Sequence, residues 1–147
     1  MSRIPLILRI LLGLAFTVFG LNHFLGFMPA PEPPPAEGAA FLFPFAVSGY
    51  LGLVKGIEVV AGLLLLANRF VPLALALLAP IIVGITYYHA ALDPAGIVPA
   101  LVFTVLEIAL AWFYRDAFLP MLRAKVSPAP ATASQPRETR AVAPASV

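Results

Sequence analysis

The segment from Phe70 to Leu92 contains no charged side chain over its whole length. A bilayer core about 30 Å thick is crossed by a helix of about 20 mostly apolar residues, because each helical residue advances 1.5 Å. This segment meets that requirement, and three others come close to it: residues 4–27, 46–67 and 97–114. The sequence therefore predicts an all-α integral membrane protein, with a four-helix transmembrane bundle in residues 1–123.

Composition supports a membrane location and excludes several classes of function. Hydrophobic residues make up 61% of the 147 residues and charged residues 11%, whereas soluble domains carry about a quarter charged residues. The net charge is +2 and the sequence has no cluster of basic residues, so it lacks the basic surface that binding to nucleic acid requires. The absence of cysteine excludes disulfides and thiolate-bound metals. No hydrolase, metalloprotease, phosphate-loop or dinucleotide motif occurs.

The connections between the segments predict the orientation. The stretch from Met28 to Phe45 holds Glu32 and Glu37 but no Lys or Arg, while the basic residues fall on the opposite side. Cytoplasmic loops are enriched in Lys and Arg, so we expect both termini to be cytoplasmic. The proline-rich residues 29–38 predict an irregular, extended connection. Residues 124–147 contain almost no large apolar side chain and are expected to be a disordered cytoplasmic tail.

Four ionisable residues lie within the predicted spans. An ionised group there costs about 2.5–3.5 kcal/mol on insertion scales, so such groups are expected to pair. Estimated depths bring all four within one layer of the bilayer, and their charges sum to zero: Arg9, Lys55, Glu58 and Glu107. We expect a buried ion-pair network that fixes helix register. A proton or substrate path, or contacts with lipid or a partner, are the alternatives.

Gly52 and Gly56 form a small-xxx-small pair within the second predicted span. Such pairs allow two membrane helices to approach closely. The pattern predicts close packing within the bundle, with a homo-oligomer contact through the same two glycines as the alternative.

Two histidines lie near the external ends of the first and third spans, at a similar predicted depth. Asn22 precedes His23, and Tyr88 precedes His89. Polar residues at the headgroup level explain this pattern, and so does a site where His23 and His89 hydrogen-bond the carbonyls of a quinone or another small amphiphile. Haem is disfavoured because both rings would have to face each other. No metal site is expected, because two nitrogens and one carboxylate are an incomplete ligand set.

Several motifs in order resemble one family of bacterial membrane proteins. They are Arg9 followed by the run from Phe19 to Phe24, the run from Val54 to Leu66 with its Lys-x-x-Glu, the run from Arg69 to Ala74, and the run from Tyr88 to Gly96. Together these motifs resemble the DoxX-like proteins over residues 4–123. The resemblance implies a four-helix bundle in the bacterial inner (plasma) membrane. Some relatives are linked to quinone-coupled sulfur oxidation and others to complexes that handle oxidative stress.

The sequence and the resemblance together predict a multi-pass membrane subunit or accessory of a redox system, docking a quinone or other amphiphile near the external side. The resemblance implies a redox partner subunit, and no covalent chemistry is assigned to this chain alone. At most the chain is a membrane component of a quinone-linked oxidoreductase, and its catalytic residues are unknown. A small carrier or proton path through the buried Lys and Glu residues, or a ligand-free assembly scaffold, are the alternative functions.

Overall fold

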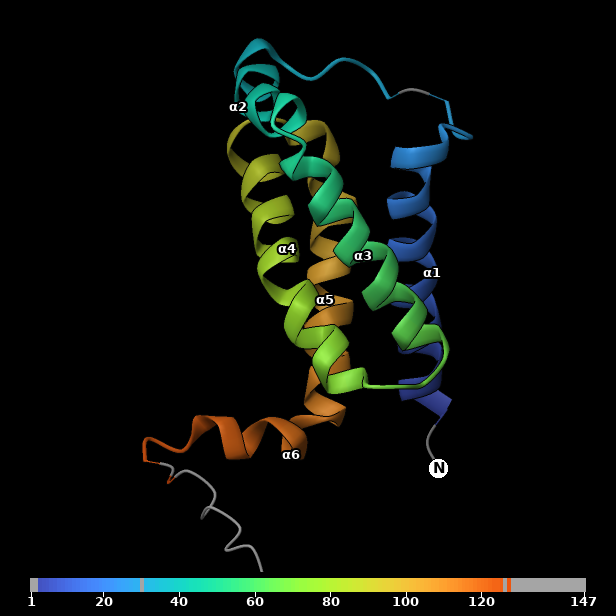
Figure 1. Ribbon diagram of the computed structural model, residues 1–147, viewed down its shortest axis with the longest axis vertical. Helices are drawn as coiled ribbons and strands as arrows, with labels where there is room; N and C mark the ends of the chain where they lie inside the picture. Colours follow the sequence, from blue (N-terminus) through green and yellow to red (C-terminus); the bar gives the residue numbers. More distant parts are fainter. Residues whose placement is uncertain (1–2, 30, 126, 128–147) are drawn as a thin grey trace, which may run out of the picture.

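The computed structural model describes residues 3–29, 31–125 and 127, and every regular element within them is helical. Figure 1 shows α1, α3, α4 and α5 side by side as an elongated bundle, with α2 at one end and α6 at the other. These ends are called the α2 end and the α6 end below. The elements are α1 (Arg3–Leu25), α2 (Ala36–Val47), α3 (Tyr50–Leu66), α4 (Val71–Ala91), η1 (Pro94–Gly96), α5 (Ile97–Phe113), α6 (Arg115–Phe118) and η2 (Leu119–Leu122).

Three helical stretches of the described chain are long and apolar enough to cross a bilayer: Arg3–Leu25, Val71–Ala91 and Pro94–Phe113. Helices α2 and α3 meet the same test together, although they are bent by 83° at the break between them. The all-α membrane fold predicted from the sequence is confirmed, with three spanning helices, or four when the bent pair counts as one. The predicted tail, residues 124–147, lies almost entirely outside the described residues.

The expected continuous span over residues 46–67 is interrupted, which corrects the prediction. Helix α2 ends at Val47 and α3 begins at Tyr50. Gly49 between them has a φ of 76°, a left-handed conformation that glycine adopts without a steric penalty. The Ser48-Gly49 dipeptide is a turn signal that the apolar pattern around it concealed.

Helix α2 begins at Ala36 and so corrects the expectation of an irregular connection over the whole of residues 29–38. The proline-rich run ends at Pro35, which is the N-cap residue of α2 and makes no side-chain cap, and a single further proline, Pro44, lies inside the helix. The residues that follow are mostly alanine and large apolar residues, and Glu37 lies in the first turn, where a carboxylate interacts favourably with the helix dipole. The proline-rich composition therefore describes the approach to α2 but not α2 itself.

The closest helix packing occurs between α1 and α3, where glycines replace larger side chains. A Cβ atom on Gly62 would lie 2.9 Å from the carbonyl oxygen of Gly13 and 2.8 Å from the backbone nitrogen of Thr17. One on Gly20 would lie 2.7 Å from a methyl group of Val59. Glycines at these positions allow the two backbones to touch, as is usual for membrane helices. We call this contact the α1–α3 seam.

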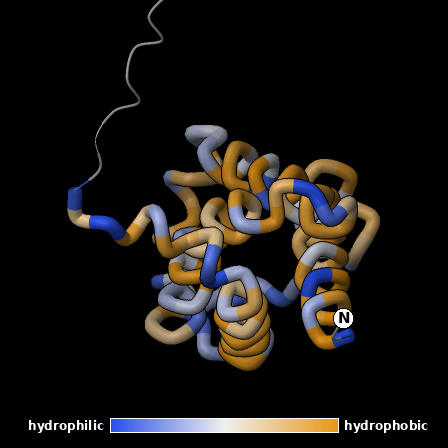
Figure 2. Tube along the Cα trace, turned by 90° about the horizontal axis from the view of Figure 1, so that it is seen from below, coloured by the Kyte–Doolittle hydropathy of each residue, from blue (hydrophilic) through white to orange (hydrophobic). Residues whose placement is uncertain are grey.

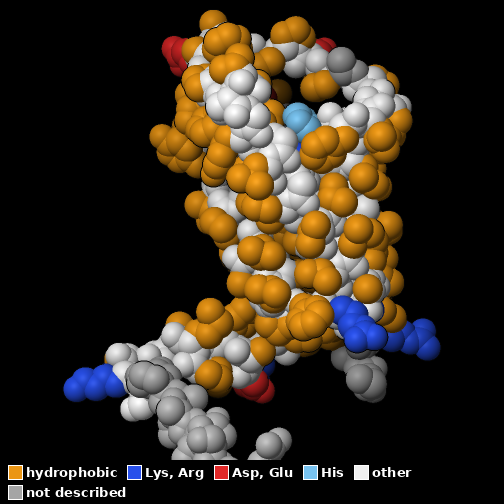
Figure 3. All heavy atoms as spheres, viewed as in Figure 1, with side chains coloured by type: hydrophobic (Ala, Val, Ile, Leu, Met, Phe, Trp, Pro, Cys, Tyr) orange, Lys and Arg blue, Asp and Glu red, His pale blue; other side chains and the backbone are white. Residues whose placement is uncertain are grey.

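Apolar side chains fill the centre of the bundle and also cover its outside. The buried core combines side chains from all four long helices, including Leu12, Phe16, Leu65, Leu75, Leu78 and Leu110. Hydrophobic residues dominate the helices seen along the bundle (Figure 2) and cover the visible flank between its ends (Figure 3). A surface of this kind matches hydrocarbon rather than water.

A single added methyl group on either of two glycines of α3 tests the seam. We expect Gly62→Ala to lower the free energy of unfolding by about 1–3 kcal/mol, since the new methyl overlaps the backbone of α1. Gly56→Ala is the matched control, because a Cβ there meets no atom within 4 Å. Thermal unfolding of both variants in one detergent measures the difference, and equal stability would show that the seam is not closely packed.

Candidate functional site

Lys55 and Glu58 form an ion pair within α3. The Lys55 Nζ atom donates to both carboxylate oxygens of Glu58, at 3.0 Å to Oε1 and 2.9 Å to Oε2. The Glu58 side chain is 2% exposed and that of Lys55 23%. A spacing of three residues places both side chains on one helical face. Because an ammonium group has three donors, one N–H of Lys55 remains for another acceptor.

His23 lies at the α2 end of the seam. Its ring meets Phe24 edge-on with centroids 5.1 Å apart, and its Nε2 atom is 4.0 Å from the point that a Cβ on Gly52 would occupy. Gly52 precedes Lys55 by three residues, which corresponds to about 4.5 Å along the helix. Figure 3 shows a hollow at this end, beneath the chain that links α1 to α2, with a histidine at its edge. His23 and Lys55 therefore occupy successive turns of one seam.

Asn22 and His89 have partners in local structure. The Asn22 side-chain oxygen accepts a hydrogen bond from the Met28 backbone nitrogen at 2.7 Å, just beyond the end of α1. His89 Nδ1 lies 2.9 Å from the Asp93 carbonyl oxygen and 3.5 Å from its carboxylate. The ring packs directly over Gly96, where a Cβ atom would overlap it. Both residues therefore stabilise chain turns at the α2 end.

Tyr88 is buried beneath α2. A Cβ atom on Gly38 would lie 2.8 Å from the Tyr88 hydroxyl, and the Phe41 ring of α2 is 6.0 Å from the tyrosine ring. The hydroxyl has no hydrogen-bond partner among the described residues. Among the described residues, no hydrogen bond or ring contact joins His23 to His89. The structure thus does not bring the two predicted histidines together as a facing pair.

Arg9 is satisfied by backbone oxygens rather than by a carboxylate. Its Nη1 atom donates to the Leu65 carbonyl at 2.7 Å and lies 3.5 Å from the Leu66 carbonyl. These carbonyls belong to the last turn of α3, which carries a partial negative charge, and the Leu65 oxygen also accepts a hydrogen bond from the Asn68 backbone nitrogen at 3.1 Å. Arg9 therefore caps α3 from the neighbouring helix α1.

Glu107 lies inside the bundle on α5. Its side chain is buried, and Oε2 has no hydrogen-bond partner within the described chain. Of the four predicted ionisable residues, the structure brings together Lys55 and Glu58, whereas Arg9 and Glu107 form no ion pair within the described residues. The expected single layer of four mutually paired charges is therefore not formed.

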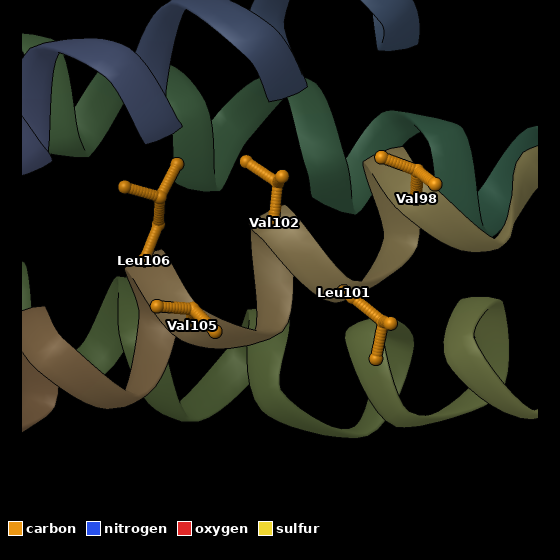
Figure 4. A pocket seen from close by; sticks show the side chains of 5 residues that line it. All are labelled: Val98, Leu101, Val102, Val105 and Leu106. Carbon is orange, nitrogen blue, oxygen red and sulfur yellow. The ribbon is translucent and has the colours of Figure 1, made fainter.

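Two apolar grooves lie on the outside of the bundle and have no polar lining side chain. One, of about 320 Å³, runs along α5 between Val98 and Leu106, and its side chains are hydrocarbon only (Figure 4). The other, of about 420 Å³, is bounded by Gly52, Gly56 and Leu77 among others. Gly56 faces open space and does not serve packing within the chain. A homo-oligomer contact through Gly52 and Gly56 stays a prediction.

Sequence reasoning missed one polar link and the role of one glycine. Thr86 of α4 and Thr104 of α5 share a hydrogen bond of 2.8 Å, and Thr104 also donates to the Ala100 carbonyl. Gly38 leaves the space that the Tyr88 hydroxyl fills. The Thr86–Thr104 hydrogen bond and the Gly38–Tyr88 contact each join two separate helices, so no residue spacing in the sequence could have predicted them. Within the described residues, no group of three or more His, Asp or Glu has the arrangement of a metal site.

Packed apolar helices with ionisable side chains between them define a multi-pass membrane protein with a polar seam. The model of the DoxX family matches residues 4–91, which is more than half of the chain, and the chain belongs to the DoxX family. No curated protein and no solved structure matches it. The matched residues contain His23, Lys55, Glu58 and His89 but not Glu107.

Proposed function

We propose that the chain is a membrane subunit or accessory of a redox system in the bacterial inner membrane, and that it docks a quinone head group at the α2 end of the α1–α3 seam. The observation that carries this proposal is the partly exposed Lys55, which is paired with Glu58 and lies one helical turn along α3 from Gly52, the residue next to the His23 ring. A quinone offers two carbonyl oxygens, and a histidine N–H and an ammonium N–H are suitable donors to them. The family membership agrees with this role but does not specify it.

The residues of this chain fit the head group in chemistry as well as position. The Phe24 ring beside His23 provides an apolar contact surface, and the spare donor of Lys55 strengthens a hydrogen bond because it is charged. A bound quinone would supply two-electron redox chemistry, with electrons passing to or from a partner subunit. This chain binds and orients the head group and holds a proton at Lys55 Nζ. Asn22 and Tyr88 act as positioning residues around the same end, whereas His89 holds the turn between α4 and α5.

The proposal places the α2 end outside the cytoplasm and both termini within it. Lys and Arg side chains gather at the α6 end, and the acidic residues of the α1–α2 connection lie at the α2 end (Figure 3). Basic residues are retained on the cytoplasmic side during insertion. Head-group docking would then occur near the external surface.

Two histidine variants test the docking site. We expect the purified protein to retain extractable quinone, and His23→Ala to release most of it because one of two hydrogen-bond donors is lost. His89→Ala is the matched control, since it removes the same side chain at the same end but outside the seam. Chromatography of the lipid extract, normalised to folded protein, measures retention.

Wild-type levels of quinone in the folded His23→Ala variant would contradict the proposed site. Equal release from both variants would contradict the separate roles given to the two histidines. A folded wild-type protein that carries no quinone in a quinone-replete membrane would favour the ligand-free scaffold.

A proton path is the second candidate function, and the environment of Glu107 favours it. A buried carboxylate oxygen without a partner is costly inside a bilayer and is rarely retained without a role. By helix rise, Glu58 and Glu107 lie about 12 and 9 Å from the α6 ends of their helices. With the Lys55 ammonium group as a proton donor, these two carboxylates would carry protons between the level of His23 and the α6 end.

Glu107→Gln separates a proton path from a structural role. The amide keeps the size of the side chain but cannot exchange a proton, so we expect proton flux into proteoliposomes to fall at least tenfold while the folded yield stays unchanged. Thr104→Val, one turn away on α5, is the control. Unchanged flux in Glu107→Gln, or loss of folded protein, would contradict a proton path through Glu107.

A further inference from the structure

The last described part of the chain leaves the bundle sideways. After α5 ends at Phe113, α6 and η2 carry the chain away from the other helices at the α6 end (Figure 1). We call residues 115–125 the α6 arm. It is too short and too polar to cross a bilayer, and its direction across the bundle is that of a segment lying on a membrane surface.

The arm exposes large apolar side chains although it lies outside the bundle. Leu119, Met121 and Leu122 are 55%, 73% and 77% exposed. Phe118, by contrast, packs against the hydrophobic core and fixes the start of the arm. Exposed hydrocarbon beside a membrane domain is stable only when lipid or another protein covers it.

Basic side chains flank these apolar residues. Arg115 precedes them, Arg123 and Lys125 follow, and Asp116 is the one acidic residue of the arm. The Arg115 guanidinium donates to the Trp112 carbonyl at 3.2 Å and stacks 5.4 Å from the centre of the Trp112 ring. Tryptophan and arginine at a helix end mark the headgroup level of a bilayer. The arm thus begins at the depth where phosphate groups lie.

We propose that the α6 arm lies in the headgroup layer of the leaflet at the α6 end and binds anionic phospholipid there. Its apolar side chains would enter the acyl boundary, and its basic side chains would contact lipid phosphates, as in other basic interfacial segments. Lipid is the occupant that the structure favours, because the arm continues the apolar flank of the bundle and its net positive charge complements an anionic surface.

The absence of cysteine makes a single-label experiment unambiguous. Met121→Cys in the full chain carries a spin label, and the protein is placed in nanodiscs of phosphatidylcholine with or without phosphatidylglycerol. Collision rates with oxygen, which concentrates in lipid, and with a water-soluble nickel chelate report the position of the label. Val83→Cys, at an exposed position on α4, is the control that should lie in lipid under both conditions.

We expect phosphatidylglycerol to raise the oxygen-to-nickel collision ratio at residue 121 several-fold and to leave it unchanged at residue 83. The double substitution Arg123→Gln and Lys125→Gln should abolish that increase, and salt should weaken it. A label that stays accessible to nickel with both lipids would overturn membrane binding by the arm. A ratio that is high but indifferent to phosphatidylglycerol would overturn the preference for anionic lipid.

Discussion

The ion pair between Lys55 and Glu58 is the interaction on which the rest of this structure depends. Each charge of this pair offsets the burial cost of the other, and removing one partner leaves an uncompensated buried charge. Their spacing of three residues lets α3 carry a complete neutral pair on its own. The glycines of the seam then bring the backbone of α1 against that face of α3. The Glu58 carboxylate is thereby enclosed by helices, while the Lys55 side chain stays partly exposed.

Interactions within one helix could be predicted from the sequence, whereas those between helices largely could not. The Lys55–Glu58 contact follows from the helical spacing of the two residues. The partner of Arg9 could not be identified, because it is a pair of backbone carbonyls at the end of α3 and no residue type marks it. Helix rise gave the depth of both histidines but not the direction in which either side chain points.

The break between α2 and α3 shows a different limit. Hydropathy over residues 46–67 is high throughout, so an apolar window cannot separate a straight span from a bent one. The backbone of Gly49 decides the outcome, since its positive φ turns the chain by a large angle.

Glu107 is a third case: its burial was expected, but the predicted ion partner is absent from its surroundings within the described residues.

The two ends of the bundle are built for different contacts. At the α2 end of the seam, His23 lies close to Gly52, and the side chain of Lys55, three residues further along α3, is partly exposed. At the α6 end, Arg9 caps α3, and Lys and Arg side chains gather (Figure 3). The apolar flank between them has grooves without polar lining. The flank between the two ends is therefore suited to contact with lipid hydrocarbon.

Replacing the Lys55–Glu58 pair tests the central claim most directly. The single variants Lys55→Met and Glu58→Met should each lose about 3–5 kcal/mol of stability, because the remaining charge is unpaired. The double variant should regain most of that stability, since two methionines pack without charge. If the pair serves the docking of a quinone, the folded double variant retains none. Quinone retained by the double variant at the wild-type level would contradict this account.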